Sequence, residues 1–141
     1  MGLASLATWI LAALLGSYLF ATWIAYGGLR PRAGDRASRF APRLIFSHVG
    51  LAVFGLAVWI GYLVVRTTVL AWAALTVLVL VAALGSTMFG LWLRGDRSRG
   101  RHALGPRHAA EDHFPPPAVL AHGAFAVTTV VLVLITALRA A

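Results

Sequence analysis

Two histidines, His48 and His122, are the side chains of this sequence best suited to hold a cofactor or a metal ion. They lie about four and about five residues into long apolar segments, so at 1.5 Å per residue both sit about 6–8 Å beyond a helix start. Polar side chains cost free energy inside a bilayer and therefore mark functional sites there. We expect these two imidazoles to lie in one layer and to act together.

Paired imidazoles on facing helices are the axial ligands of b-type haem in membrane bundles. We therefore expect His48 and His122 to hold one haem b, which would exchange electrons with a quinone or with a partner redox subunit. Met88 has a similar depth and is a substitute ligand, while Tyr26 is slightly shallower and can hydrogen-bond a quinone head. The haem propionates would pair at the cytoplasmic surface with two arginines, Arg43 and Arg107.

The residue types that are missing narrow the chemistry. No cysteine is present, which excludes disulfides, thiolate metal sites, Cys-ligated iron–sulfur clusters and covalently attached haem. No second histidine pair lies near the other surface, so two stacked haems are not expected within one chain. The acidic residues all lie in loops, and no Ser-His-Asp or paired-carboxylate arrangement can be assembled from them. Whether the chain is an enzyme is left undecided.

Three other roles for the same layer remain open. Glu111 or His113, in the loop before the last apolar segment, could fold back over the two histidines and hold zinc or iron, and Met88 would suit copper. Paired histidines beside a stripe of threonines could carry protons in a small transporter. Both histidines could instead hydrogen-bond backbone carbonyls and serve packing alone, in a cofactor-free accessory or assembly subunit of a membrane complex.

The segments that must position these residues are apolar and long. Hydrophobic residues make up 60% of the 141 residues, charged residues only 11%, and the mean hydropathy is +0.85. A helix needs about 20 apolar residues to cross about 30 Å of hydrocarbon. We predict an all-α integral membrane bundle of four antiparallel transmembrane helices, in a single domain over residues 1–141 without an internal repeat. The predicted spans cover about 3–28, 44–65, 68–93 and 117–138.

The arginines predict the orientation of the four spans. All 12 basic residues are Arg; ten lie in the loops 29–43 and 94–116, and only Arg66 and Arg139 lie on the other side. By the positive-inside rule, both long loops are cytoplasmic and both termini are outside. Lys, Asn, Gln and Cys are absent, which indicates the codon usage of a high-GC bacterium, so we expect a bacterial cytoplasmic (inner) membrane.

The lipid bilayer is the first partner that this composition predicts. The net charge is +8 and the pI is near 11.7, yet the arginines lie beside apolar segments, where they orient the chain and contact lipid headgroups. We therefore expect no nucleic acid. A quinone, other membrane subunits and a second copy of the chain are the further partners consistent with a small bundle.

Small and polar residues at helical spacing predict which faces point into the bundle, because helix contacts in lipid favour such residues. The predicted inward stripes are His48, Gly55, Trp59 and Tyr62; His122, Thr129 and Thr136; and Thr76, Ala83, Thr87 and Gly90. Aromatic residues near the span ends predict two interfacial belts. The outer belt would contain Trp9, Trp59, Tyr62 and Trp72, and the inner belt Trp23, Tyr26, Phe46, Phe89 and Trp92.

Overall fold

The computed structural model of the chain describes residues 1–29, 38–99 and 109–141, and these residues are helical apart from short connections. Four long helices and one short 3-10 helix are present: α1 Gly2–Ala25, α2 Pro42–Val65, α3 Thr68–Arg99, η1 Ala110–His113 and α4 Pro116–Ala140. Each of the four long helices is long and apolar enough to cross a membrane. The predicted spans are confirmed as helices within a few residues, except that α3 continues to Arg99.

Proline and left-handed residues determine where the helices begin and end. Pro42 and Pro116 occupy the first turn of α2 and α4, where a missing N–H breaks no intrahelical hydrogen bond. Helix α1 ends before Gly27, which adopts a φ of 85°. Helix α2 ends at Arg66, which has a φ of 62° and donates its N–H to the Tyr62 carbonyl at 2.8 Å. This tight turn places α3 directly beside α2.

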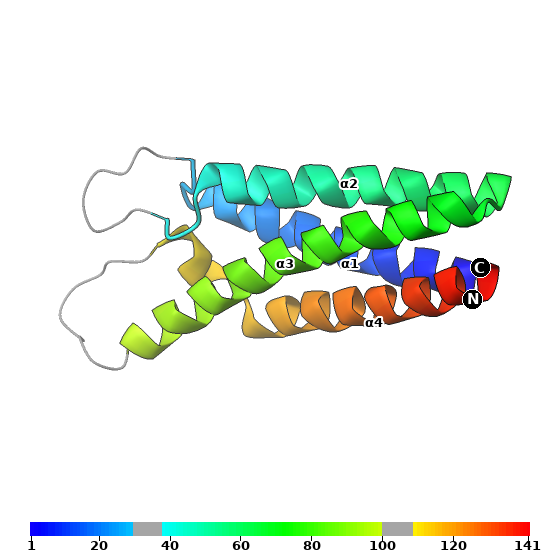
Figure 1. The fold of residues 1–141 in the computed structure, drawn as a ribbon. Helices are drawn as coiled ribbons and strands as arrows, with labels where there is room; N and C mark the ends of the chain where they lie inside the picture. The colour runs from blue at the N-terminus through cyan, green and yellow to red at the C-terminus, as the bar shows by residue number, and fades with distance from the viewer. Residues whose placement is uncertain (30–37, 100–108) are drawn as a thin grey trace.

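The four long helices form two closely packed pairs. Helix α1 packs most extensively on α4 and α2 on α3, whereas the α1–α2 and α3–α4 contacts that join the two pairs are less extensive. We call these joining contacts the seam. Among the described residues α1 and α3 do not contact each other, nor do α2 and α4, so each of these two couples lies on a diagonal of the bundle. Both termini lie at one end, the terminal end, and η1 lies at the other, the loop end (Figure 1).

Two hydrophobic clusters fill the bundle, one towards each end. The cluster at the terminal end is built around Trp9, Trp59 and Tyr62, and the cluster at the loop end around Trp23 and Trp92. These five aromatic residues are buried inside the bundle, so their assignment to interfacial belts is wrong. A bundle of small residues leaves room for large rings in its centre, and filling that room outweighs the preference of Trp and Tyr for the interface. The exposed aromatic residues are Tyr26, Phe46, Trp72 and Phe89.

The predicted stripes of α2 and α4 face the bundle as expected. Gly55, Trp59 and Tyr62 on α2, and Thr129 and Thr136 on α4, are all buried.

The stripe predicted on α3 is wrong. Thr76, Ala83 and Thr87 are exposed, and each of the two threonine hydroxyls donates to the carbonyl one turn earlier. A hydroxyl satisfied by its own helix can face lipid, so threonine spacing does not identify the inward face. The buried face of α3 is made instead by Ala74, Leu78, Val81 and Trp92.

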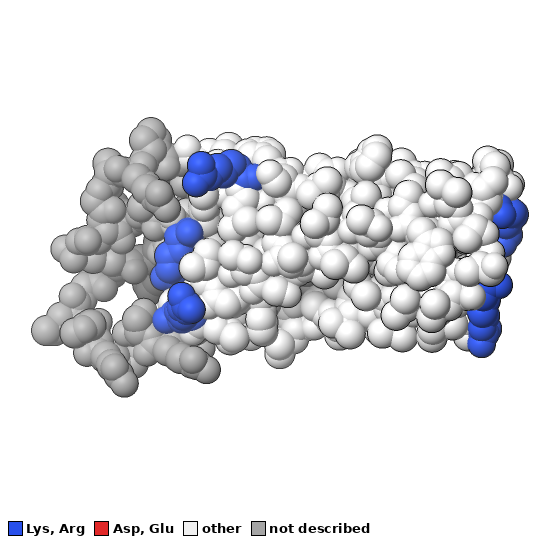
Figure 2. Space-filling model, in the orientation of Figure 1, with Lys and Arg blue, Asp and Glu red and all other residues white. Residues whose placement is uncertain are grey.

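Charge is confined to the two ends of the molecule. In the face shown by Figure 2, arginines lie at both ends and the broad band between them carries no charged residue. Of the described arginines, Arg66 and Arg139 lie at the terminal end, where α2 and α4 end. Such a band between two charged ends is the pattern of a membrane-spanning bundle.

Candidate cofactor site

The imidazoles of His48 and His122, which are both half-buried, lie against each other between the helix pairs. Their ring centroids are 6.3 Å apart and their planes make an angle of 68°. His48 comes from α2 and His122 from α4, which lie on a diagonal, so the two rings approach each other across the seam from different helix pairs. The expected common depth of the two histidines agrees with this geometry.

Each histidine is held by the partner helix of its own pair. Nδ1 of His48 lies 3.0 Å from the Val81 carbonyl oxygen on α3, and Nδ1 of His122 lies 2.9 Å from the Ala12 carbonyl oxygen on α1. A carbonyl oxygen can only accept, so each Nδ1 carries a hydrogen, and in a neutral imidazole Nε2 then keeps its lone pair. Neither Nε2 is hydrogen-bonded to any described residue. Two acceptor nitrogens are therefore left without a donor in an apolar bundle.

A glycine on the partner helix makes room for each ring. A Cβ on Gly16 would lie 3.0 Å from Cε1 of His122, and a Cβ on Gly85 would lie 3.1 Å from Cε1 of His48. In both cases the glycine stands one turn after the residue whose carbonyl accepts the hydrogen bond, Ala12 or Val81. We call this arrangement, a histidine with its carbonyl acceptor and its glycine, the His–Gly module.

The two His–Gly modules reflect a repeat in the sequence that the prediction of no internal repeat missed. The pattern Leu-Gly-Ser-x-x-Phe-x-x-Trp occurs twice, as residues 15–23 in α1 and as residues 84–92 in α3. Likewise, a proline six residues before a histidine begins both α2 and α4. The repeat would have drawn attention to Gly16 and Gly85, which were not among the predicted site residues.

The burial pattern follows the repeat. Each buried residue of α1 has a buried counterpart at the equivalent position of α3, and three of the four buried residues of α2 have one in α4. The equivalent buried pairs are Ser5 and Ala74, Trp9 and Leu78, Ala12 and Val81, Trp23 and Trp92, Gly55 and Thr129, Trp59 and Val133, and Tyr62 and Thr136. The bundle therefore consists of two similar helical hairpins, α1–α2 and α3–α4, and each hairpin holds the histidine of the other.

The other residues predicted for the haem lie towards the loop end. Met88 is one turn beyond Gly85 on α3 and packs against the loop-end cluster. Arg43 is exposed in the first turn of α2. Tyr26 stacks on His113, with ring centroids 3.7 Å apart, so these two predicted residues meet each other at the loop end. Arg107 lies outside the described residues.

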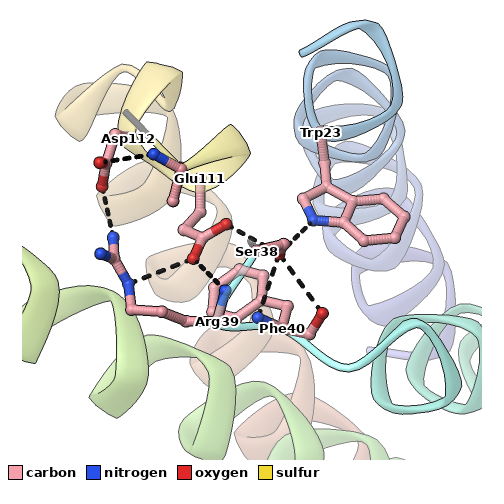
Figure 3. Close-up of polar contacts among 7 residues, drawn as sticks. Trp23, Ser38, Arg39, Phe40, Glu111 and Asp112 are labelled. Carbon is pink, nitrogen blue, oxygen red and sulfur yellow. Dashed lines mark hydrogen bonds and ion pairs between the residues drawn. The ribbon is translucent and has the colours of Figure 1, made fainter. Parts of the chain in front are cut away.

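Glu111, predicted as a metal ligand, lies instead in a polar cluster that joins the two connections at the loop end (Figure 3). Its carboxylate is fully buried and accepts hydrogen bonds from the Ser38 hydroxyl at 2.8 Å and from the Arg39 backbone N–H at 2.6 Å. The Trp23 indole N–H donates to the same Ser38 hydroxyl at 2.9 Å. These contacts engage both carboxylate oxygens of Glu111, and no three His, Asp or Glu side chains of the described residues gather closely enough to hold a metal ion.

Arg39 completes this cluster, which sequence reasoning did not find. Its Nε lies 3.1 Å from a Glu111 oxygen, in an ion pair whose N–H is not aligned for a hydrogen bond, and its Nη2 pairs with Asp112. Gly95 of α3 lies against the guanidinium, where a Cβ would clash. We call Ser38, Arg39, Glu111 and Asp112 the loop-end clasp. It links the segment before α2 to the segment before α4 over the loop-end cluster.

Comparison with known proteins adds no relative to this picture: no protein-family model, curated protein or solved structure matches the chain. The function must therefore be argued from the two His–Gly modules and their surroundings.

Proposed function

We propose that this chain binds one haem b between His48 and His122 and passes electrons between a quinone or a redox partner and that haem. The observation that carries the proposal is the pair of Nε2 atoms that lack a donor, presented across the seam by two helix pairs of the same design. A neutral imidazole whose Nδ1–H is hydrogen-bonded to a carbonyl is the usual form of a histidine that ligates a metal through Nε2.

The number of protein donors favours haem over a bare metal ion. Zinc and similar ions need about four ligands from the protein and solvent, whereas the haem macrocycle supplies four nitrogens and leaves two axial positions. Among the described residues the layer offers two imidazoles and no carboxylate. Two imidazoles that ligate one ion from opposite sides, with metal–nitrogen bonds of about 2 Å, place their ring centroids roughly 6 Å apart. The observed 6.3 Å is close to that spacing.

The seam is the part of the bundle where a flat group would be accommodated most easily. Each histidine is bonded within its own helix pair, so the two pairs can adjust relative to each other around a flat group without breaking either Nδ1 hydrogen bond. The contacts across the seam are less extensive than those within the pairs. A packing role alone would account for the two Nδ1 atoms but would leave both Nε2 atoms without a partner.

The remaining residues have supporting roles in this proposal. A bound haem would supply one-electron transfer. The clusters around Trp23 and Trp59 lie on the loop side and on the terminal side of the layer. Arg43 would pair with the propionates, and the exposed Tyr26 could hydrogen-bond a quinone at the loop end. The chain would be an antiparallel bundle in a bacterial cytoplasmic membrane, with the loop end cytoplasmic and both termini outside.

The haem content of the purified protein tests the proposal. The chain is expressed with ample haem supply and purified in detergent, and haem is quantified as the pyridine haemochrome. We expect one non-covalent b-type haem for each chain, and the same content in a His113→Ala control, because His113 lies at the loop end away from the layer. A colourless protein under these conditions would overturn the proposal and favour a cofactor-free subunit.

A further inference from the structure

A cleft of about 230 Å³ opens at the terminal end of the bundle, at the end opposite the loop-end clasp. It lies where α2 and α4 end and α1 begins. Its lining residues are Met1, Gly2, Tyr62, Arg66, Thr136, Arg139 and Ala140. Its volume is sufficient for a group of a few heavy atoms such as a phosphate, and it belongs to neither His–Gly module.

The charged side chains at this cleft are all positive among the described residues. Arg66 and Arg139 are exposed, and neither forms an ion pair with a described carboxylate. The described acidic side chains, those of Glu111 and Asp112, pair with Arg39 at the loop end. Arg139 donates only to the thioether sulfur of Met1, at 3.2 Å, and a thioether is a weak acceptor. Two guanidinium groups beside one cleft are therefore available to an anion.

Tyr62 provides a second and independent observation at the same cleft. Its side chain is only 5% exposed and its ring packs on Trp59, with centroids 4.8 Å apart. Its hydroxyl makes no hydrogen bond to any described residue, although the residue lines the cleft. Tyr62 lines the cleft and its hydroxyl has no partner among the described residues, so the hydroxyl can donate a hydrogen bond to a ligand in the cleft.

The backbone sets the position of Arg66 relative to Tyr62. Arg66 adopts the left-handed conformation, which is uncommon for residues other than glycine, and donates its N–H to the Tyr62 carbonyl at 2.8 Å. The backbone therefore holds Arg66 one helical turn after Tyr62, so both side chains extend from the same end of α2.

We propose that the terminal-end cleft binds a phosphate group, held by Arg66 and Arg139 and accepting a hydrogen bond from the Tyr62 hydroxyl. The N–H donors of the planar arginine guanidinium match the spacing of phosphate oxygens and can bind two of them at once. The ends of membrane-spanning helices lie at the level of lipid headgroups, so the phosphate would come from an anionic lipid or from a free phosphate. The site is independent of haem.

Binding measurements with three probes test this site. Detergent-purified protein in phosphate-free buffer is titrated with inorganic phosphate, with dihexanoyl phosphatidylglycerol and with dihexanoylglycerol, which lacks phosphate. The Arg66→Gln/Arg139→Gln double variant should bind the phosphate-bearing probe roughly tenfold or more weakly, and Tyr62→Phe about threefold more weakly. The matched control, Arg94→Gln/Arg97→Gln, removes the same charge from the loop end of α3 and should change binding less than about twofold.

The pattern of binding decides the result. Binding of both phosphate-bearing probes identifies a site for the phosphate group itself, and binding of the phosphatidylglycerol alone identifies a lipid site. Either result supports the proposal if the terminal-end variants weaken binding and the loop-end control does not. Equal losses in both double variants would reveal general charge attraction and would overturn the proposal, as would no binding of either phosphate-bearing probe. If Tyr62→Phe and the unchanged protein bind with equal affinity, the Tyr62 hydroxyl does not bind the phosphate group.

Discussion

The two helix pairs hold their histidines in the same way but are joined at the loop end by opposite charges. In each pair an imidazole donates from Nδ1 to a carbonyl on the partner helix, and a glycine one turn further along makes room for the ring. At the loop end, by contrast, the segment before α2 supplies the cation Arg39 and the segment before α4 supplies the anions Glu111 and Asp112. Two imidazoles held in the same way are suited to bind one central ligand from both sides. A guanidinium and two carboxylates, by contrast, are suited to bind each other.

The terminal end differs from both of these regions. Trp59 and Tyr62 on α2 stand opposite their smaller counterparts, Val133 and Thr136, on α4. The large rings of one hairpin therefore fill space that the small residues of the other leave free. The two hairpins are therefore alike at the His–Gly modules and at Trp23 and Trp92, and unlike in the cluster at the terminal end.

Removal of either histidine should have the largest effect. We expect His48→Ala and His122→Ala each to lower the haem retained per chain by roughly tenfold or more, because an axial ligand is lost and even second-shell changes cost 10–100-fold in metal affinity. The measurement is the pyridine haemochrome of each purified variant, repeated after addition of imidazole, which should restore part of the haem. Full retention in one variant and loss in the other would show that the two modules are not equivalent.

Neutralising Glu111 should weaken the loop end without removing the cofactor. Glu111→Gln keeps the shape of the side chain but loses the charge that faces Arg39, and hydrogen bonds to charged groups contribute about 1.5–3 kcal/mol. We expect the free energy of unfolding in mixed micelles to fall by about that amount, while the haem content below the transition is unchanged. The control, Arg94→Gln, changes an exposed charge at the same end, and a loss of haem in Glu111→Gln would link the clasp to the cofactor site.

The glycines of the two modules should show a smaller effect that depends on the ring. In Gly16→Ala and Gly85→Ala the new methyl group would lie about 3 Å from an imidazole carbon, and overpacking of this kind typically costs 1–3 kcal/mol. We expect haem affinity to fall a few-fold in both variants. Gly50→Ala and Gly123→Ala gain the same helix propensity but meet no atom within 4 Å, so they are matched controls. Equal behaviour of all four variants would show that the glycines do not position the rings.

The hydroxyl contact between α1 and α4 should contribute least. The Thr129 hydroxyl lies 2.9 Å from the Thr8 hydroxyl, a contact that Gly55, its counterpart on α2, cannot make. Interhelical hydrogen bonds of this kind contribute about 0.6 kcal/mol in membrane proteins. Thr129→Val should therefore lower the unfolding free energy by less than about 1 kcal/mol, as measured in mixed micelles. A loss of several kcal/mol would show that the α1–α4 pair is stabilised differently from the α2–α3 pair.

Hydropathy was sufficient to predict the four helices and the depth of the histidines. The predicted starts of α2 and α4, at about 44 and 117, lie within two residues of the observed starts at Pro42 and Pro116. The inward faces of these helices followed from His48 and Thr129 at helical spacing. These predictions succeeded because they depend on local composition and on helix geometry, both of which can be read from a single chain.

The features that sequence reasoning missed depend on contacts between distant segments. The Glu111–Arg39 ion pair joins two connections that are far apart in the chain, and nothing local to either residue indicates it. The stripe containing Thr76 was misassigned because its hydroxyl is satisfied within its own helix. Gly16 and Gly85 were detectable through the repeated Leu-Gly-Ser-x-x-Phe-x-x-Trp pattern, but their role is clear only when the histidines lie against them.

The coordination of the iron tests most directly whether both helix pairs supply a ligand to one haem. Low-temperature electron paramagnetic resonance of the oxidised protein distinguishes iron with two imidazole ligands from iron with one. We predict a single low-spin ferric species with two imidazoles, which should become high-spin or lose its haem in His48→Ala and in His122→Ala alike. A high-spin signal in the unchanged protein, or no haem signal at all, would contradict a ligand shared between the two modules.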